Sequence, residues 1–199
     1  MPVQLLKDSI EGIDIYLLDQ ILKNRYQAKT KIVDAGCGNG RNLKWFYNSG
    51  FTIYGIDQKL DNIEYCKNTY SNQKNHFKQA VVENIPFETN YFNHVICNAV
   101  LHFAKDLSRF LEMFEELLRI LKPEGSLFIR MASNFGMENQ VEYLNNGNYK
   151  LPDGSTRFLL TTEILEYIQN KFNFTLLEDV KTTIVQNKRC MTTLVLKKS

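Results

Sequence analysis

The sequence has few residues of the kinds that hold metals or form disulfides, and it has no long apolar run. Its 199 residues include three isolated histidines and four scattered cysteines, at positions 37, 66, 97 and 190, without a Cys-x-x-Cys pair. This pattern excludes a disulfide framework and a metal cluster, so we expect no metal site. No apolar stretch approaches the roughly 18 residues of a membrane-spanning helix, and we expect no membrane segment.

Charge and length also restrict the class of protein. A formal net charge of +2 gives no electrostatic reason to expect a dedicated nucleic-acid binder. The amino terminus lacks the basic and then apolar pattern of a signal peptide, which favours a cytoplasmic protein. With 44% hydrophobic and 23% charged residues the composition is that of an ordinary globular protein. The length predicts a single domain over residues 1–199.

The most informative stretch covers residues 32–42. An apolar run with β-branched residues passes directly into glycines at alternate positions, Gly36, Gly38 and Gly40, and residues 43–46 can continue as a helix. Such a strand, turn and helix needs glycine where the backbone takes φ > 0 and where a ligand approaches without meeting Cβ atoms. The unpaired N–H groups of the helix start suit a carboxylate or phosphate. We therefore expect a nucleotide-like ligand at the carboxyl end of this strand.

A second strand, residues 52–57, ends in an acidic residue, Asp57. An acid roughly 20 residues after the first glycine can accept hydrogen bonds from the hydroxyls of a ribose. The glycine spacing is Gly-x-Gly-x-Gly, one residue shorter than the Gly-x-Gly-x-x-Gly dinucleotide fingerprint. The glycine turn and the acid fit an adenosine-containing ligand, and the shorter glycine spacing disfavours a nicotinamide dinucleotide.

At these residues the sequence resembles the class I S-adenosylmethionine-dependent methyltransferases, in particular small bacterial-type members. Asp34 and the three glycines match the first motif of that family, Asp-x-Gly-x-Gly-x-Gly, and Asp57 matches its acid after the second strand. The resemblance implies S-adenosylmethionine as cofactor. It also implies a Rossmann-like α/β fold with a seven-stranded, mostly parallel sheet, a C-terminal antiparallel hairpin, and helices on both faces.

The rest of the chain alternates helix and strand, as a parallel sheet with crossover helices requires. Period-3.6 patterns predict helices over 13–26, 59–70 and 107–121, with Thr161 or Thr162 capping a further helix. We expect strands over 77–82, 91–98 and 126–131, with residues 122–125 ending the preceding helix. Two β-rich runs, 174–185 and 189–196, are joined by three residues and predict the antiparallel hairpin.

The adenine side of the expected site departs from the family pattern. The family often has an aspartate at the position held here by Val81, so the resemblance implies that backbone groups near Val81 and Val82, with Glu83, hold the adenine. Asn98 ends the fourth strand and faces the same crevice, near the reactive methyl group in the resembling enzymes. The cofactor-binding candidates are Asp34, Gly36, Cys37, Gly38, Gly40, Asn42, Asp57, Gln58, Val81, Val82, Glu83 and Asn98.

Candidates for substrate contact and catalysis are weaker. His102 is a possible general base because an unperturbed imidazole titrates near neutrality. Residues 132–160 break the helix–strand alternation with turn residues and aromatics, and we expect a lid or acceptor pocket there. Tyr149 and Arg157 within it, and Tyr16 in the leading helix, are the candidate substrate residues.

The resemblance implies methyl transfer by in-line displacement, which asks the protein mainly for placement and needs no general base for an activated acceptor. We expect a small-molecule acceptor. Three alternatives remain: an RNA methyltransferase, a nicotinamide oxidoreductase, and a non-catalytic cofactor-binding or scaffold protein. The basic residues near the carboxyl end, such as Lys188 and Arg189, lack the interleaved aromatics of a nucleic-acid platform.

Overall fold

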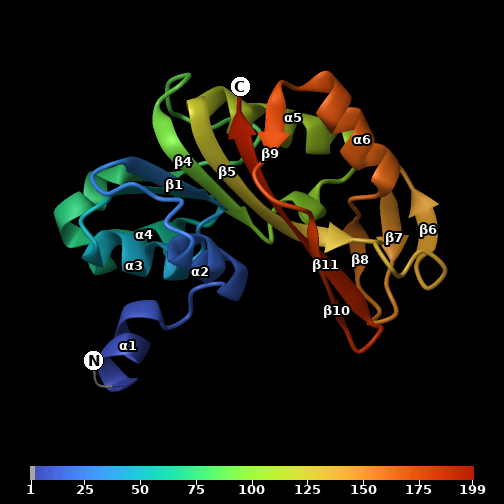
Figure 1. The fold of residues 1–199 in the computed structure, drawn as a ribbon, viewed down its shortest axis with the longest axis horizontal. Coiled ribbons are helices and arrows are strands. Elements are labelled where there is room, and N and C mark those ends of the chain that lie inside the picture. The colour runs from blue at the N-terminus through green and yellow to red at the C-terminus, as the bar shows by residue number, and fades with distance from the viewer. Residues whose placement is uncertain (1–2) are drawn as a thin grey trace.

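The computed structural model describes residues 3–199, so the first two residues of the predicted domain lie outside the described residues. The fold is mixed α/β, with helices packed around one central sheet (Figure 1). The helices are α1 (Val3–Ile10), α2 (Ile15–Leu22), α3 (Lys44–Asn48), α4 (Leu60–Thr69), α5 (Leu107–Ile120) and α6 (Thr162–Lys171). The strands of the central sheet are β1 (Lys31–Ala35), β2 (Thr52–Asp57), β3 (Phe77–Gln79), β4 (Phe92–Asn98), β5 (Leu121–Ser133), β9 (Phe174–Leu176), β10 (Lys181–Val185) and β11 (Arg189–Lys198).

The strand order of the sheet is β10-β11-β5-β4-β1-β2-β3, and β9 also pairs with β11. Strands β1 to β5 run parallel, whereas β11 is antiparallel to β5, β9 and β10. This confirms the mostly parallel sheet with a C-terminal antiparallel hairpin. The chain reverses its direction of travel across the sheet between β1 and β4, and such a switch point opens a crevice at the carboxyl ends of the two strands.

Helices cover both faces of the sheet, as predicted (Figure 1). On one face, Leu17 of α2, Phe46 of α3 and Ile63 of α4 pack in one apolar cluster with Ile32 of β1. On the other face, α5 and α6 bury their apolar sides against Val33 and its neighbours. Successive strand residues point to opposite faces, so the near-continuous apolar runs of β1 and β4 are explained by burial on both sides.

Several element boundaries differ from the predictions. The helix predicted over 13–26 is shorter, because its N-cap is Asp14 and Asn24 takes the left-handed conformation with φ 55°. The strand predicted over 77–82 ends at Gln79. The predicted β-run 174–185 is divided into β9 and β10, which both pair with β11. Helix α5 ends before residues 122–125 as predicted, but these residues already belong to β5.

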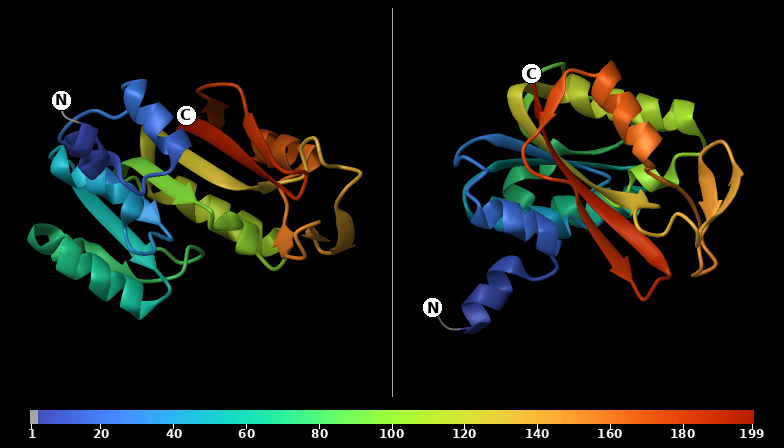
Figure 2. Two further views of the ribbon diagram at one scale, coloured as in Figure 1. Left: turned by 90° about the horizontal axis from the view of Figure 1, so that it is seen from below. Right: turned by 45° about the vertical axis from the view of Figure 1, so that its right-hand side comes forward.

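The segment 132–160 is not structureless. It contains a separate antiparallel sheet of β6 (Glu142–Asn145), β7 (Asn148–Lys150) and β8 (Thr156–Phe158). The predicted turns lie between these strands, with Gly147 and Gly154 both at φ 84°. Buried Phe158 anchors the small sheet by stacking on Phe110 of α5 at 5.0 Å between ring centroids. Figures 1 and 2 show this sheet and α1 at opposite ends of the molecule.

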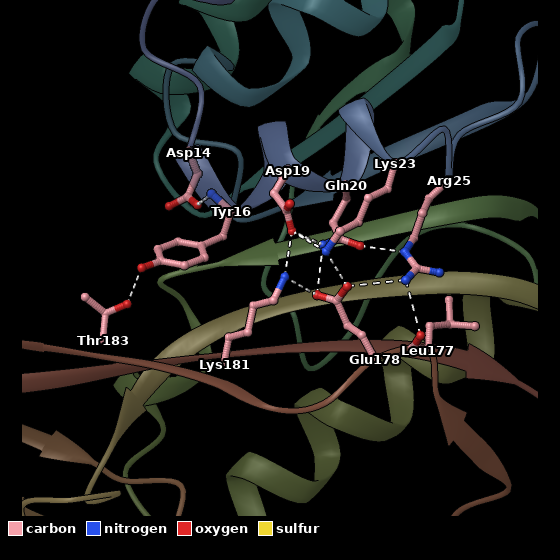
Figure 3. Close-up of polar contacts among 10 residues, drawn as sticks. All are labelled: Asp14, Tyr16, Asp19, Gln20, Lys23, Arg25, Leu177, Glu178, Lys181 and Thr183. Atoms are coloured by element: carbon pink, nitrogen blue, oxygen red, sulfur yellow. Dashed lines mark hydrogen bonds and ion pairs between the residues drawn. The ribbon is translucent and has the colours of Figure 1, made fainter.

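Helix α2 is attached to the hairpin edge of the sheet by polar side chains (Figure 3). Lys181 Nζ lies 2.7 Å from Asp19 Oδ2 and 2.8 Å from Glu178 Oε1, and Lys23 Nζ lies 2.8 Å from Glu178 Oε2. A network of several charges holds its geometry better than an isolated surface pair. None of the helices between residues 3 and 199 combines the length and the apolar character that a bilayer crossing needs.

Candidate functional site

The glycine turn after β1 is held against the end of β2. The N–H groups of Gly36 and Cys37 both donate to the Ile56 carbonyl, at 2.9 and 2.8 Å. Gly36, Gly38 and Gly40 all take positive φ, at 82°, 54° and 76°, which explains why glycine occupies each position. The turn therefore has the conformation that the sequence predicts.

The three glycines differ in what surrounds them. A Cβ atom on Gly36 would lie 2.4 Å from Val100 Cγ2, and one on Gly40 would lie 2.8 Å from the Tyr70 ring. A Cβ atom on Gly38 would meet nothing within 4 Å. Gly36 and Gly40 thus serve close packing within the protein, whereas Gly38 faces open space where a ligand can approach the backbone.

Asp57 connects the glycine turn to the start of α4. Its Oδ2 atom accepts a hydrogen bond from the Gly38 N–H at 2.9 Å. Its Oδ1 atom accepts from the Lys59 N–H at 2.8 Å and from Asn62 Nδ2 at 3.0 Å. An ionised carboxylate has about four acceptor positions, so Oδ2 retains capacity for one more donor.

A cavity of about 560 Å³ opens beside Asp57, at the switch point of the sheet. Seven of the twelve predicted cofactor residues line it. They are Gly36, Asp57, Gln58, Val81, Val82, Glu83 and Asn98. The structure thus gathers residues from four separate loops at one edge of the sheet, as the family resemblance implies, and their contact with a ligand remains a prediction.

The other predicted cofactor residues lie in or beside the glycine turn. Cys37 is buried, and its thiol contacts the Gly38 carbonyl at 3.5 Å. Asn42 Oδ1 accepts a hydrogen bond from the Asp14 N–H at 3.0 Å, which ties the turn to the start of α2. The Gly40 carbonyl accepts a hydrogen bond from the Tyr70 hydroxyl at 2.7 Å. These three residues shape the turn and, like Asp34 and Gly38, lie outside the cavity lining.

Asp34 is buried to 1% exposure, and neither carboxylate oxygen has a hydrogen-bond partner among residues 3–199. Burial raises the pKa of Asp34 to about 7, against the opposing positive charge of Arg41. Asn98, at the end of β4, is also buried. Its amide oxygen and nitrogen likewise have no hydrogen-bond partner among residues 3–199. Unpaired buried polar groups are costly. Asn98 lines the cavity and Asp34 lies outside its lining, and their contact with a ligand remains a prediction.

The region predicted to hold adenine contains an ion pair. Val81 is 40% exposed and lines the cavity. Glu83 Oε1 lies 2.6 Å from Arg109 Nε of α5, and both residues are part of the lining. The aspartate position of the family is therefore apolar here, with a charged pair close by.

Several lining residues were not predicted from the sequence. Arg109 and Met113 lie in α5, where the apolar period suggested only a core helix, and Asn62 is placed by its bond to Asp57. Ala99 takes φ 61°, unusual for a residue with a side chain, directly after Asn98. The full set of unpredicted lining residues is Lys59, Asn62, Ala80, Ala99, Val100, Phe103, Arg109 and Met113. No local pattern distinguishes them, because they meet only when the sheet forms.

His102 lies outside the cavity lining, and its Nδ1 atom accepts the Ala132 N–H at 3.2 Å. Burial, together with the nearby charge of Arg157, lowers the pKa of His102 to about 4. The imidazole is therefore neutral near pH 7 and a weak proton acceptor, in contrast to the titration near neutrality that is expected of an unperturbed histidine.

The three candidate substrate residues are dispersed. The Tyr16 hydroxyl is hydrogen-bonded to the Thr183 hydroxyl (Figure 3), and Tyr149 packs on Tyr143 within the small sheet. Arg157 contacts the cavity wall, because its guanidinium carbon is 5.1 Å from the ring centroid of Phe103, a lining residue. A substrate contact by any of the three remains a prediction.

Comparisons with known proteins agree with this geometry. A model of the methyltransferase domain family matches residues 33–129, which contain the glycine turn, Asp57 and Asn98. A SAM-dependent methyltransferase from Methanosarcina mazei has a similar fold, with a TM-score of 0.70 over 89% of this chain and 96% of that chain, at 19% sequence identity.

Curated relatives carry different acceptors in their names. A tRNA (carboxymethyluridine(34)-5-O)-methyltransferase from Arabidopsis thaliana is 33% identical over 98 residues, which cover 49% of this chain and 23% of the relative. A malonyl-[acyl-carrier protein] O-methyltransferase from Salmonella typhimurium (strain LT2) is 26% identical over 94 residues, covering 47% of this chain and 36% of the relative. The chain spans less than half the length of the curated relatives it matches.

Proposed function

We propose that this chain belongs to the class I S-adenosylmethionine-dependent methyltransferase family and transfers a methyl group from S-adenosylmethionine to a small-molecule acceptor. The observation that carries the proposal is the set of groups at the switch point of the sheet. Asp57 keeps acceptor capacity on Oδ2 at the cavity, and Asp34 and Asn98 hold buried polar atoms without partners among the described residues.

These residues fit S-adenosylmethionine. Oδ2 of Asp57 can accept one ribose hydroxyl, and backbone groups at Val81 and Val82 can border the adenine. The carboxylate of Asp34 and the amide of Asn98 suit the charged amino-acid group, whose hydrogen bonds would satisfy them. Gly38 admits the ligand to the backbone because no atom of the protein lies within 4 Å of its Cβ position.

When bound, this cofactor supplies an activated methyl group on a sulfonium with an excellent leaving group. The protein then contributes placement more than acid–base chemistry. Asn98 is buried at the end of β4, where its side chain can orient groups near the acceptor. The low pKa of His102 makes this histidine a poor general base. We therefore propose a mechanism in which an already nucleophilic acceptor is held in line by the cavity walls.

The acceptor class is supported by the small sheet of residues 142–158. Arg157 of β8 lies over Phe103 at the cavity, and the Asn148 side chain donates to the Lys105 carbonyl at 2.7 Å. These contacts hold the insertion beside the cavity, so that it can form one wall of an acceptor pocket. The formal net charge of +2 gives no electrostatic reason to favour RNA as the acceptor.

The second candidate function is RNA methylation, which is favoured by the relative named for a tRNA. Incubation with methyl-labelled S-adenosylmethionine distinguishes the two when total tRNA and an RNA-free extract of small metabolites are offered separately. We expect label in the small-molecule fraction and none with the Gly38→Val variant. Label in tRNA alone would replace our acceptor with RNA. Label in neither fraction, from protein that binds the cofactor, would favour a non-catalytic role.

A further inference from the structure

Seven buried side-chain polar atoms lack a hydrogen-bond partner among residues 3–199, and five of them belong to Asp34, Asn98 and Arg130. These residues lie on β1, β4 and β5, which are adjacent in the sheet. Buried groups of this kind are normally satisfied. They lie near the carboxyl ends of three neighbouring strands, and Asp34, level with Ile96, is two residues before Asn98 in the register. Their concentration there therefore indicates one ligand rather than three separate defects.

All three side chains point to the same face of the sheet. Asn98 and Arg130 are direct partners in the β4–β5 register. The residues two positions earlier on each strand, Ile32, Ile96 and Phe128, belong to the apolar cluster that contains Leu17 of α2. Since alternate strand residues share a face, Asp34, Asn98 and Arg130 project toward α2 just beyond that cluster.

Arg130 is held in place by α2 but is not satisfied by it. Its Nη1 atom lies 3.5 Å from Asp14 Oδ2, and its guanidinium carbon lies 4.7 Å from the centroid of the Tyr16 ring. Tyr16 is itself fixed by Thr183, and Asp14 by the Tyr16 N–H (Figure 3). The Nε–H of Arg130 remains buried without an acceptor in the described chain, although its side chain is 18% exposed.

We propose that Arg130 binds the carboxylate of the amino-acid group of S-adenosylmethionine, while Asp34 binds its ammonium. The inference rests on the proposed function and adds a residue to it. A guanidinium presents its N–H donors in a planar fork that matches a carboxylate, and the free Nε–H is part of that fork. Arg130 follows directly after residues 33–129, which match the family model.

The test compares two ligands by titration calorimetry. S-adenosylhomocysteine carries the amino-acid group, whereas 5′-methylthioadenosine keeps the adenosine and the sulfur and lacks that group. Arg130→Met should weaken binding of S-adenosylhomocysteine by about 10- to 100-fold, the range for a hydrogen bond to a charged group. It should leave the affinity for 5′-methylthioadenosine unchanged, which also shows that the variant is folded. Arg130→Lys should lose less affinity for S-adenosylhomocysteine, because lysine keeps the positive charge.

Lys181→Met is the matched control. It also replaces a cation by a neutral side chain between α2 and the sheet, but Lys181 pairs with Asp19 and Glu178 and not with Arg130. We expect its ratio of the two affinities to equal that of the unaltered protein. An equal loss of S-adenosylhomocysteine binding in Lys181→Met would show that loosening of α2 is the cause and would overturn the assignment.

The remaining outcomes separate the two proposals. If Arg130→Met keeps the full affinity for S-adenosylhomocysteine, the carboxylate subsite is wrong and the proposed cofactor stands. If the unaltered protein binds both ligands equally, no amino-acid subsite exists and the inference again fails. If the unaltered protein binds neither ligand, the proposed function itself fails.

Discussion

The Asp57 carboxylate accepts a hydrogen bond from the Gly38 N–H at 2.9 Å. The acid after the second strand is therefore a structural partner of the glycine turn as well as a wall of the cavity. Substitutions at the two residues therefore affect the same site in different ways. A change at Asp57 removes hydrogen bonds, whereas a side chain added at Gly38 fills the open space beside the turn.

Asp57→Ala should weaken binding of S-adenosylhomocysteine by about 1.5–3 kcal/mol, because a charged acceptor for the ribose is lost. It should also lower the free energy of unfolding, since three donors lose their acceptor. Calorimetry and urea unfolding measure the two effects. Asn62→Ala removes only one donor and should cost less on both measures. Unchanged affinity in Asp57→Ala would remove Asp57 from the binding site.

Gly38→Val should abolish cofactor binding and leave the protein folded. The new side chain would enter the open space at Gly38, and its left-handed backbone would cost about 1–2 kcal/mol of stability. Gly40→Val is the comparison, because its Cβ would lie 2.8 Å from Tyr70 and 3.0 Å from Cys66 Sγ, and it should destabilise the fold more. Full affinity in Gly38→Val would show that the ligand does not approach this turn.

Asp34 should make the stability of the ligand-free protein depend on pH. Burial raises its folded-state pKa to about 7 from an ordinary value of 3.8. Between these values the native state binds more protons than the unfolded state, so stability falls as pH rises through this window. Asp34→Asn lacks the titration. The unfolding free energy of the unaltered protein, relative to Asp34→Asn, should therefore decrease between about pH 4 and pH 7. A difference that is constant with pH would contradict the burial of an unpaired carboxyl.

His102 should stay neutral well below its ordinary titration range, because burial lowers its pKa to about 4. An NMR titration of the imidazole carbons, with the signal assigned through His102→Gln, measures this directly. A midpoint between pH 6 and 7 would instead restore the histidine as a candidate general base.

The sequence predicts the parts of the site that depend on local backbone chemistry. Gly38 must have φ > 0, and Asp57 must end a strand, so both were identified without a structure. The mostly parallel sheet and the C-terminal hairpin follow from the alternation of helix and strand and from the short connection before Arg189, and the structure confirms them.

Other features depend on contacts between distant segments. Arg130 lies in an ordinary strand pattern, and only the packing of Asp14 and Tyr16 over it shows that its Nε–H is left free. Arg109 lies on α5, whose apolar periodicity predicts only packing against the core. It lines the cavity, where it pairs with Glu83. The small sheet formed within 132–160 was missed because its strands are short and mostly exposed, so no alternation marks them.

Titration calorimetry with S-adenosylmethionine, S-adenosylhomocysteine and NAD in parallel tests the central claim most directly. We predict micromolar binding of both sulfur compounds and no binding of NAD, because the glycine turn is one residue shorter than a dinucleotide turn. Binding of NAD alone, or of none of the three by folded protein, would contradict the assignment of this cavity to S-adenosylmethionine.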